Sequence, residues 1–170
     1  YTPTTGLTDE NYSWKVIAIN AAGENESTAW TFLIDTVGPA TPSLLDPADG
    51  AATNDNTITF RWTIVTDPSG VTYMVQVDND PDFTSPEVDV SDIIENIYTP
   101  SELTDENYSW HVRAVDGANN TSEWSTVWTF IIDTVAPVPP DLRYPTDGLK
   151  TKDNTPTFVW GAIVDPSGVT

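Results

Sequence analysis

Residues 104–119 read TDENYSWHVRAVDGAN, and 96 positions earlier residues 8–23 read TDENYSWKVIAINAAG. In the later copy, the apolar residues Tyr108, Trp110, Val112 and Ala114 alternate with polar or charged ones. Alternation with a period of two places one set of side chains on one face of a β-strand. This stretch therefore predicts a strand with one buried face, and its recurrence predicts a chain built from repeats.

The repetition continues beyond this strand. Residues 30–50 return at 128–148, and residues 59–72 return at 157–170, both with an offset of 98. The difference of two residues between the offsets falls in a loop before Trp128, where a change in length costs little. The repeating unit is therefore about 98 residues long.

Two proline-containing stretches mark the joints between units, DTVGPATP at 35–42 and DTVAPVPP at 133–140. Proline ends strand pairing and stiffens a linker. We therefore predict the last strands of one repeat at 1–37, a complete repeat at 38–135 and the first strands of a further repeat at 136–170. The end segments are expected to be completed either by further chain or by neighbouring copies.

Other strands follow from the same alternation. The strongest are 57–65, with Ile58, Phe60, Trp62 and Ile64 inward; 71–78, with Tyr73, Val75 and Val77 inward; and 127–133, with Trp128, Phe130 and Ile132 inward. Shorter strands are expected near 43–46, 86–91 and 95–100. The DPSG sequence at 67–70 predicts a turn that joins the first two strands as a hairpin. Seven short strands in one unit predict an all-β, Greek-key β-sandwich.

One spacing carries a family resemblance. Leu103, Tyr108 and then Trp110 resemble the tyrosine corner of fibronectin type III and immunoglobulin-like domains, and Trp62 and Tyr73 fit the core of that family. The longer pattern of linkers and turns resembles the tandem repeats of bacterial and archaeal cell-surface proteins. The resemblance implies that the chain serves as part of a stalk, an adhesin, a surface-layer or filament subunit, or as a spacer in a secreted glycosidase.

The composition excludes several classes of function. The chain has 26 acidic and 6 basic side chains, a net charge of −20, one His and no Cys. So acidic a chain is repelled by nucleic acids and anionic membranes, and without Cys it has no disulfide, thiol nucleophile or zinc-thiolate site. No apolar run is long enough to insert in a membrane. We expect an extracellular protein at the cell surface.

The sequence DNDPDF, at residues 78–83, offers one candidate metal site. Asp78, Asp80 and Asp82 alternate there, and their oxygens could converge on calcium. The alternative is a solvated turn between two strands, because the Gly and the distal Glu of an EF-hand are missing. The complete repeat has 17 acids against 2 arginines, so diffuse stabilisation by divalent ions is favoured over one tight site. No other cofactor is expected.

Other polar residues are assigned to the surface. His111 is expected to face solvent, and Trp124 either packs over a strand edge or stacks on a sugar or a partner. The neighbouring acids Asp9 and Glu10, like Asp105 and Glu106, lie side by side in turns rather than across a cleft. Five asparagines lie in N-x-S/T sequons and are candidates for glycosylation: Asn11, Asn25, Asn107, Asn119 and Asn120.

Together these features predict a non-catalytic, extracellular structural repeat of a stalk, adhesin, surface layer or filament. Assembly by strand complementation between copies is one route. The alternative is a carbohydrate-binding or spacer module of a secreted polysaccharide-degrading enzyme. The expected partners are other copies or neighbouring repeats, and surface glycans in the alternative. No nucleophile and base stand in a catalytic arrangement, so no enzyme activity is predicted.

Overall fold

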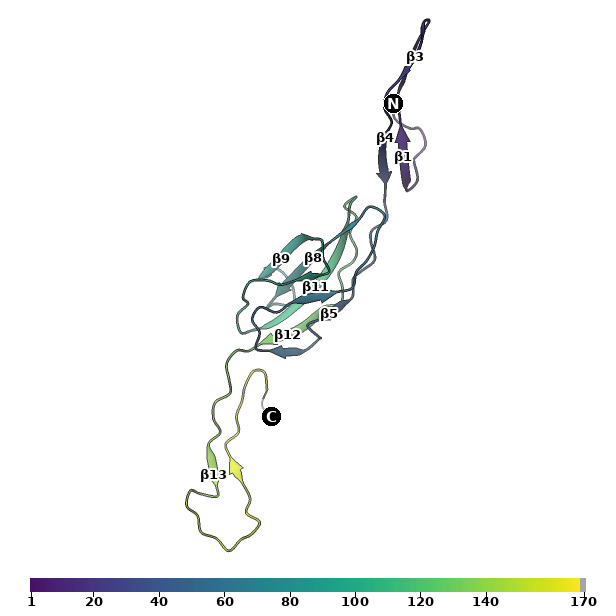
Figure 1. The fold of residues 1–170 in the computed structure, drawn as a ribbon. Helices are drawn as coiled ribbons and strands as arrows, with labels where there is room; N and C mark the ends of the chain where they lie inside the picture. Colours follow the sequence, from purple (N-terminus) through teal and green to yellow (C-terminus); the bar gives the residue numbers. More distant parts are fainter. Residues whose placement is uncertain (169–170) are drawn as a thin grey trace.

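The computed structural model describes residues 1–168, and within them every regular element is a β-strand. Val169 and Thr170, the last two residues of the predicted segment 136–170, lie outside the described residues. Figure 1 shows a two-layered body preceded by a narrow arm of paired strands and followed by another. We call residues 38–135 the central unit, residues 1–37 the N-terminal segment and residues 136–168 the C-terminal segment.

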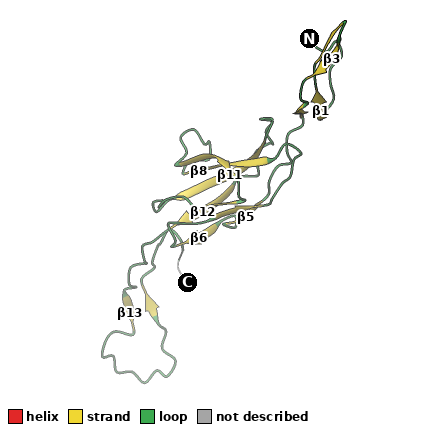
Figure 2. Ribbon diagram, turned by 45° about the horizontal axis from the view of Figure 1, so that its top comes forward, coloured by secondary structure: helices red, strands yellow, loops and turns green. Residues whose placement is uncertain are grey.

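The central unit consists of two sheets facing each other (Figure 2). The smaller sheet has the order β10-β7-β5, with β5 at Leu44–Asp46, β7 at Phe60–Trp62 and β10 at Ile97–Tyr98. The larger has the order β6-β12-β11-β8-β9. Its strands are β6 at Ala51–Thr53, β8 at Val71–Asp78, β9 at Val88–Ile93, β11 at Asn107–Asp116 and β12 at Trp128–Ile132. All pairs are antiparallel except β6 with β12.

The chain changes sheets three times after β7, and this produces the Greek-key connection. It runs from β7 to β8 in the larger sheet, returns from β9 to β10 beside β7, and crosses again to β11 beside β8. The predicted all-β class and Greek-key sandwich are confirmed. The predicted hairpin between β7 and β8 is wrong: the two strands lie in different sheets, and the DPSG turn lies on the path between the layers.

The core lies between the layers and is rich in aromatic side chains. Phe60, Trp62 and Trp110 have no exposed surface, and Tyr108 and Phe130 are each 2% exposed. Phe60 packs against Trp110 and Phe130, with ring centroids 4.8 and 5.5 Å away. Burial of aromatic side chains on this scale supports a sandwich without disulfides.

The tyrosine corner is present in both copies. The Tyr108 hydroxyl donates to the Thr104 carbonyl at 3.2 Å, and the Tyr12 hydroxyl donates to the Thr8 carbonyl at 3.0 Å. Each bond closes the connection that precedes its strand. The resemblance that rested on Tyr108 thus corresponds to an observed contact.

Two strand details differ from expectation. Ile64 was expected inward but is 71% exposed, because β7 ends at Trp62 and the chain then turns toward the larger sheet. The backbone N–H of Val65 donates instead to the Tyr73 hydroxyl at 3.0 Å. The short strand β6 was not predicted, so the central unit has eight strands rather than seven.

The flanking segments contain only paired strands. In the N-terminal segment, β1 (Glu10–Trp14) pairs with β4 (Trp30–Ile34), and β2 (Ile17–Asn20) pairs with β3 (Gly23–Glu26). In the C-terminal segment, β13 (Leu142–Tyr144) pairs with β14 (Val159–Trp160). The register Tyr12 to Phe32 repeats the register Tyr108 to Phe130. The boundaries 1–37, 38–135 and 136–170 stay a prediction.

Candidate cation site at the junction before the central unit

The linker that follows β4 packs against the turn that follows β11. The Asn120 side chain donates to the Asp35 carbonyl at 3.1 Å and to the Asp116 carboxylate at 2.8 Å. A Cβ on Gly38 would lie 2.8 Å from the Thr121 carbonyl oxygen, closer than real Cβ atoms come. Glycine at position 38 therefore allows the linker to lie directly on the central unit.

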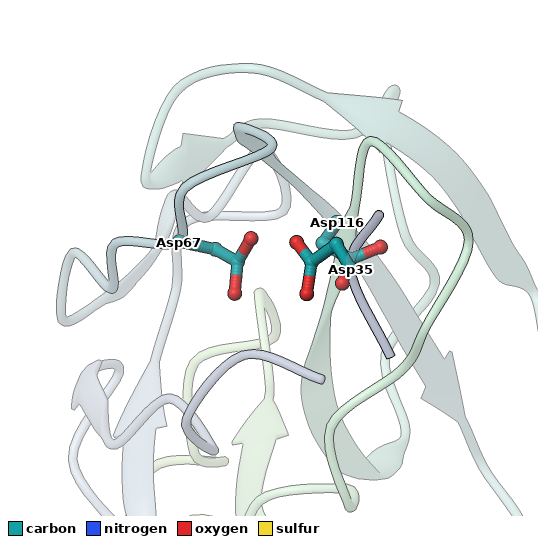
Figure 3. A group of neighbouring side chains, drawn as sticks. All are labelled: Asp35, Asp67 and Asp116. Carbon is teal, nitrogen blue, oxygen red and sulfur yellow. The ribbon is translucent and has the colours of Figure 1, made fainter. Parts of the chain in front are cut away.

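Three carboxylates converge at this junction (Figure 3). Asp35 comes from the linker, Asp67 from the connection between β7 and β8, and Asp116 from the end of β11. One oxygen from each lies within 4.8 Å of the other two. Among the acidic and histidine side chains of residues 1–168, this is the one group of three or more that gathers so closely.

Local hydrogen bonds hold two of the three carboxylates in place. Oδ1 of Asp116 accepts from the N–H groups of Ala118 and Asn120, at 2.9 and 2.8 Å. Oδ1 of Asp67 accepts from the N–H and the hydroxyl of Ser69, at 2.9 and 2.8 Å. These are local turn contacts that Asp forms readily. They fix the direction in which the remaining oxygens point.

The charge of this group is not balanced by protein cations. The two salt bridges in the described part of the chain, Lys15 with Glu26 and Arg143 with Asp141, lie elsewhere. The Ser69 backbone N–H holds the pKa of Asp67 below its ordinary value, against the opposing effect of burial. Asp67 is therefore ionised at neutral pH. Such a set of hard oxygens can coordinate calcium or magnesium.

Two of the three aspartates have counterparts at the next junction. Asp133 and Asp165 lie 98 residues after Asp35 and Asp67, and the Ser167 backbone N–H donates to the Asp133 carboxylate at 3.3 Å. Backbone donation from Val135 lowers the pKa of Asp133, and Ser167 acts in the same direction. The position 98 residues after Asp116 falls beyond residue 170. The sequence reasoning treated the motifs around these residues as linker and turn only.

The predicted calcium ligands do not gather in this way. Asp78, Asp80 and Asp82 form a chain of turns in which each carboxylate accepts from the backbone N–H two residues later, at 2.8, 3.3 and 2.9 Å. Asp78 is 1% exposed, whereas Asp80 and Asp82 are exposed. They are not among the groups whose oxygens lie within 4.8 Å of one another. Calcium binding there stays a prediction.

His111 was expected on the surface but is 7% exposed. It lies on the outer face of the larger sheet, stacked between Phe83 and Trp124 with ring centroids 3.8 and 3.9 Å away. Burial lowers the pKa of His111 to about 4, and the nearby charge of Arg113 acts in the same direction. The Arg113 guanidinium lies 4.6 Å from the Trp124 ring centroid. Trp124 therefore packs over the face of the central strand β11 rather than over a strand edge, as had been predicted.

The paired acids of the turns have structural contacts. The carboxylate of Asp105 accepts from the N–H and hydroxyl of Thr134 at 3.0 to 3.1 Å, and Asp9 makes the same contacts with Thr36. These bonds connect the turn before one strand to the start of the following linker. They engage the aspartate of each acidic pair that was considered for catalysis.

The sequon asparagines differ in accessibility. Four are exposed, namely Asn11, Asn25, Asn107 and Asn119. The fifth, Asn120, uses its side-chain amide to hold Asp35 and Asp116 at the junction. Glycosylation at the exposed positions stays a prediction, and a glycan on Asn120 would disrupt the junction contacts.

Comparison with solved structures returns fibronectin type III-like modules. A Fn3-like protein from Clostridium thermocellum is 19% identical with a TM-score of 0.42, over 59% of this chain and 99% of that one. The fibronectin(III)-like modules of Clostridium thermocellum CbhA are 19% identical with a TM-score of 0.45, over 76% of this chain and 65% of those modules. The fibronectin type-III domain of human fibronectin type III domain containing protein 3 is 18% identical with a TM-score of 0.39, over 68% of this chain and 98% of that domain.

No family model matches the sequence. No curated protein matches it either. The fold assignment rests on the strand order and pairing described above. Residues 1–168 contain no helix that could cross a lipid bilayer.

Proposed function

We propose that the chain is part of a non-catalytic, extracellular repeat protein that holds its units at defined positions in a stalk, adhesin, surface layer or filament. The junction carries the proposal. Asn120 ties the linker to the central unit, and Gly38 permits backbone contact with Thr121. A linker that only tethered two domains would not need a glycine under backbone contact. A fixed joint suits a spacer.

The acidic surface supports an exposed, extracellular location for such a spacer. The central unit has 17 acids against 2 arginines, so its charge accumulates with each added repeat. A high net charge keeps long arrays soluble and separates neighbouring arrays. The same charge disfavours nucleic acid and anionic membranes as partners.

Neighbouring repeat material, from the same chain or from other copies, is the proposed partner of the flanking segments. Trp14 is 51% exposed and Phe158 is 69% exposed, whereas their counterparts Trp110 and Phe60 have no exposed surface. In the central unit these counterparts pack against each other with ring centroids 4.8 Å apart. Complementary strands would cover the same faces in the flanking segments.

The carbohydrate-binding alternative relied on Trp124. One face of that ring stacks on His111 and Arg113 lies over it at 4.6 Å. Sugar stacking needs an open aromatic face, so this residue does not favour the alternative. A glycan array on the wild type and on Trp124→Ala would revive it if specific binding were seen and then lost.

The joint can be tested by pulsed electron paramagnetic resonance. Because the chain has no Cys, spin labels can be placed at Glu24→Cys and Thr84→Cys, both exposed positions, in a buffer containing sodium, magnesium and calcium salts. We expect a narrow distribution of distances. Gly38→Val, whose side chain would push the linker off Thr121, should broaden it. A broad distribution in both proteins would exclude a fixed joint.

Association through the flanking segments needs a separate measurement. Sedimentation of the 170-residue chain across a range of concentrations should show reversible association if other copies cover the exposed faces. Trp14→Glu and Phe158→Glu should each weaken it. A monomer at every concentration would remove association between copies and leave covering strands from the same chain.

A further inference from the structure

We propose that Asp35, Asp67 and Asp116 bind one divalent cation, with calcium preferred, and that this cation fastens the N-terminal segment to the central unit. The cation is held jointly, because Asp35 belongs to the linker and the other two residues belong to the central unit. The binding site stands on the geometry alone. Its effect on the joint rests on the proposed spacer function.

The first argument is charge. Oxygens of three carboxylates within 4.8 Å of one another repel strongly when ionised. No Lys or Arg of residues 1–168 forms a salt bridge with any of them. Backbone donors nevertheless hold Asp67 and Asp116 in the converging arrangement. A bound cation would convert this repulsion into attraction.

The second argument is a shielded oxygen atom of Asp35. Oδ2 of Asp35 has less than 1 Å² of exposed surface and accepts no hydrogen bond, while Oδ1 accepts from the Val37 N–H at 3.3 Å. A carboxyl oxygen that is shielded from water needs a partner. Asn120 bonds the Asp35 carbonyl rather than this oxygen. A cation bound between the three carboxylates would lie close to the carboxyl group of Asp35 and could be its partner.

The chemistry of the donors selects the ion. All three side chains offer carboxylate oxygens. Hard cations such as calcium and magnesium prefer these ligands, whereas soft metals prefer sulfur ligands. They come from three separate segments rather than from one compact loop (Figure 3). Calcium tolerates irregular sets of six to eight oxygens, whereas magnesium demands a tight octahedron. Calcium is therefore favoured, with water filling the remaining positions.

The partial recurrence of the site predicts its stoichiometry. Asp133 and Asp165 repeat two of the three ligands, but the third equivalent position falls beyond residue 170. We therefore expect one tight calcium ion per 170-residue chain. A second ion, at the two-carboxylate position, should bind much more weakly.

Isothermal titration of calcium into chelator-treated protein at near-physiological salt tests the binding. The wild type should bind one ion, and Asp35→Asn should weaken binding about tenfold or more, because carboxylate count sets calcium affinity. Asp35→Asn lies in the linker, so the sandwich remains folded, which circular dichroism checks. Asp80→Asn is the matched control with the same loss of charge and should leave affinity unchanged.

Three results would overturn the site: no saturable binding, binding unaffected by Asp35→Asn, or binding lost in Asp80→Asn instead. The last result would assign calcium to the turn at residues 78–82. A magnesium titration that proved tighter than the calcium one would overturn the preference for calcium.

The spin-label pair described above separates the site from the function. If the cation fastens the joint, the distance distribution at Glu24 and Thr84 should be narrow with calcium and broad after chelation, and Asp35→Asn should stay broad in both. A distance distribution that is narrow in every case would support the proposed spacer function and would show that the cation is not what fixes the joint. A distance distribution that is broad in every case would exclude the proposed spacer function. The calcium titration would still show whether the cation site exists.

Discussion

Acidification from pH 7.5 to pH 5 should destabilise the central unit through His111. The ring is 7% exposed and is stacked between Phe83 and Trp124, with its Nε2 2.9 Å from the side-chain oxygen of Gln76. Burial, together with Arg113, lowers its pKa to about 4. The neutral ring is therefore part of the folded structure.

The sign follows from comparing the two states. Histidine in an unfolded chain has a pKa of about 6.5, so between that value and about 4 the unfolded state of this protein binds more protons. The stabilisation is fully present above pH 6.5 and is lost as the pH falls through this window. Integrating between the two pKa values gives a loss of about 2 kcal/mol at pH 5.

Urea unfolding followed by tryptophan fluorescence measures this loss, since Trp62 and Trp110 are fully buried. For a small domain, about 2 kcal/mol moves the urea midpoint by roughly 1 M. The control is His111→Gln, which cannot titrate, while the carboxylates respond to pH in both proteins. The wild type should lose about 2 kcal/mol more than the variant between pH 7.5 and 5. Equal losses in the two proteins would show that His111 is not held neutral by its surroundings.

The remaining predictions concern packing and backbone contacts, and urea unfolding tests each of them. Gly117→Ala should destabilise by about 1 to 3 kcal/mol, because its Cβ would lie 2.2 Å from the Ser69 carbonyl oxygen; Gly6→Ala, with nothing within 4 Å, should be neutral. Phe60→Ala should cost about 3 to 5 kcal/mol, since the ring has no exposed surface, and a cost below 1 kcal/mol would contradict the described core. Tyr108→Phe should cost about 1 kcal/mol through loss of the hydroxyl bond to the backbone four residues earlier; unchanged stability would remove the corner as a stabilising element.

The strands predicted best from sequence are those with long alternation. Residues 71–78 were predicted as a strand, and β8 spans Val71–Asp78 with Tyr73, Val75 and Val77 buried. Alternation fails where a strand ends before its apolar pattern does. Ile64 continues the pattern of β7, yet it is 71% exposed because the chain leaves the sheet after Trp62.

His111 shows a second limit. The pattern correctly placed it opposite Trp110 and Val112, on the outer face of the strand. It could not show that this face is covered, because the covering rings belong to Phe83 and Trp124, in loops 28 positions before and 13 positions after it. In the N-terminal segment, Lys15 takes the place of His111 and Glu26 that of Trp124, and these two residues form a salt bridge instead.

The junction site was not predicted for a similar reason. Its residues are 32 and 49 positions apart in the chain, and only the crossing between sheets brings Asp67 near Asp116. The signal available in the sequence was the recurrence of Asp35 and Asp67 as Asp133 and Asp165. It was found in motifs already explained as a linker and a turn. By contrast, the regular spacing of Asp78, Asp80 and Asp82 suggested a set of metal ligands. In the structure each of these carboxylates accepts a hydrogen bond from a backbone N–H group instead.

The junction gives each unit a direction. Asp35 is contributed from the upstream side, whereas Asp67 and Asp116 belong to the downstream side, so the contact is heterologous rather than self-complementary. Two upstream faces cannot form this joint with each other, nor can two downstream faces. Any array held by such joints is polar, in the sense of a head-to-tail polymer, with one terminus displaying a single carboxylate and the other displaying a pair. The two termini could therefore be capped, anchored or extended by different chemistry.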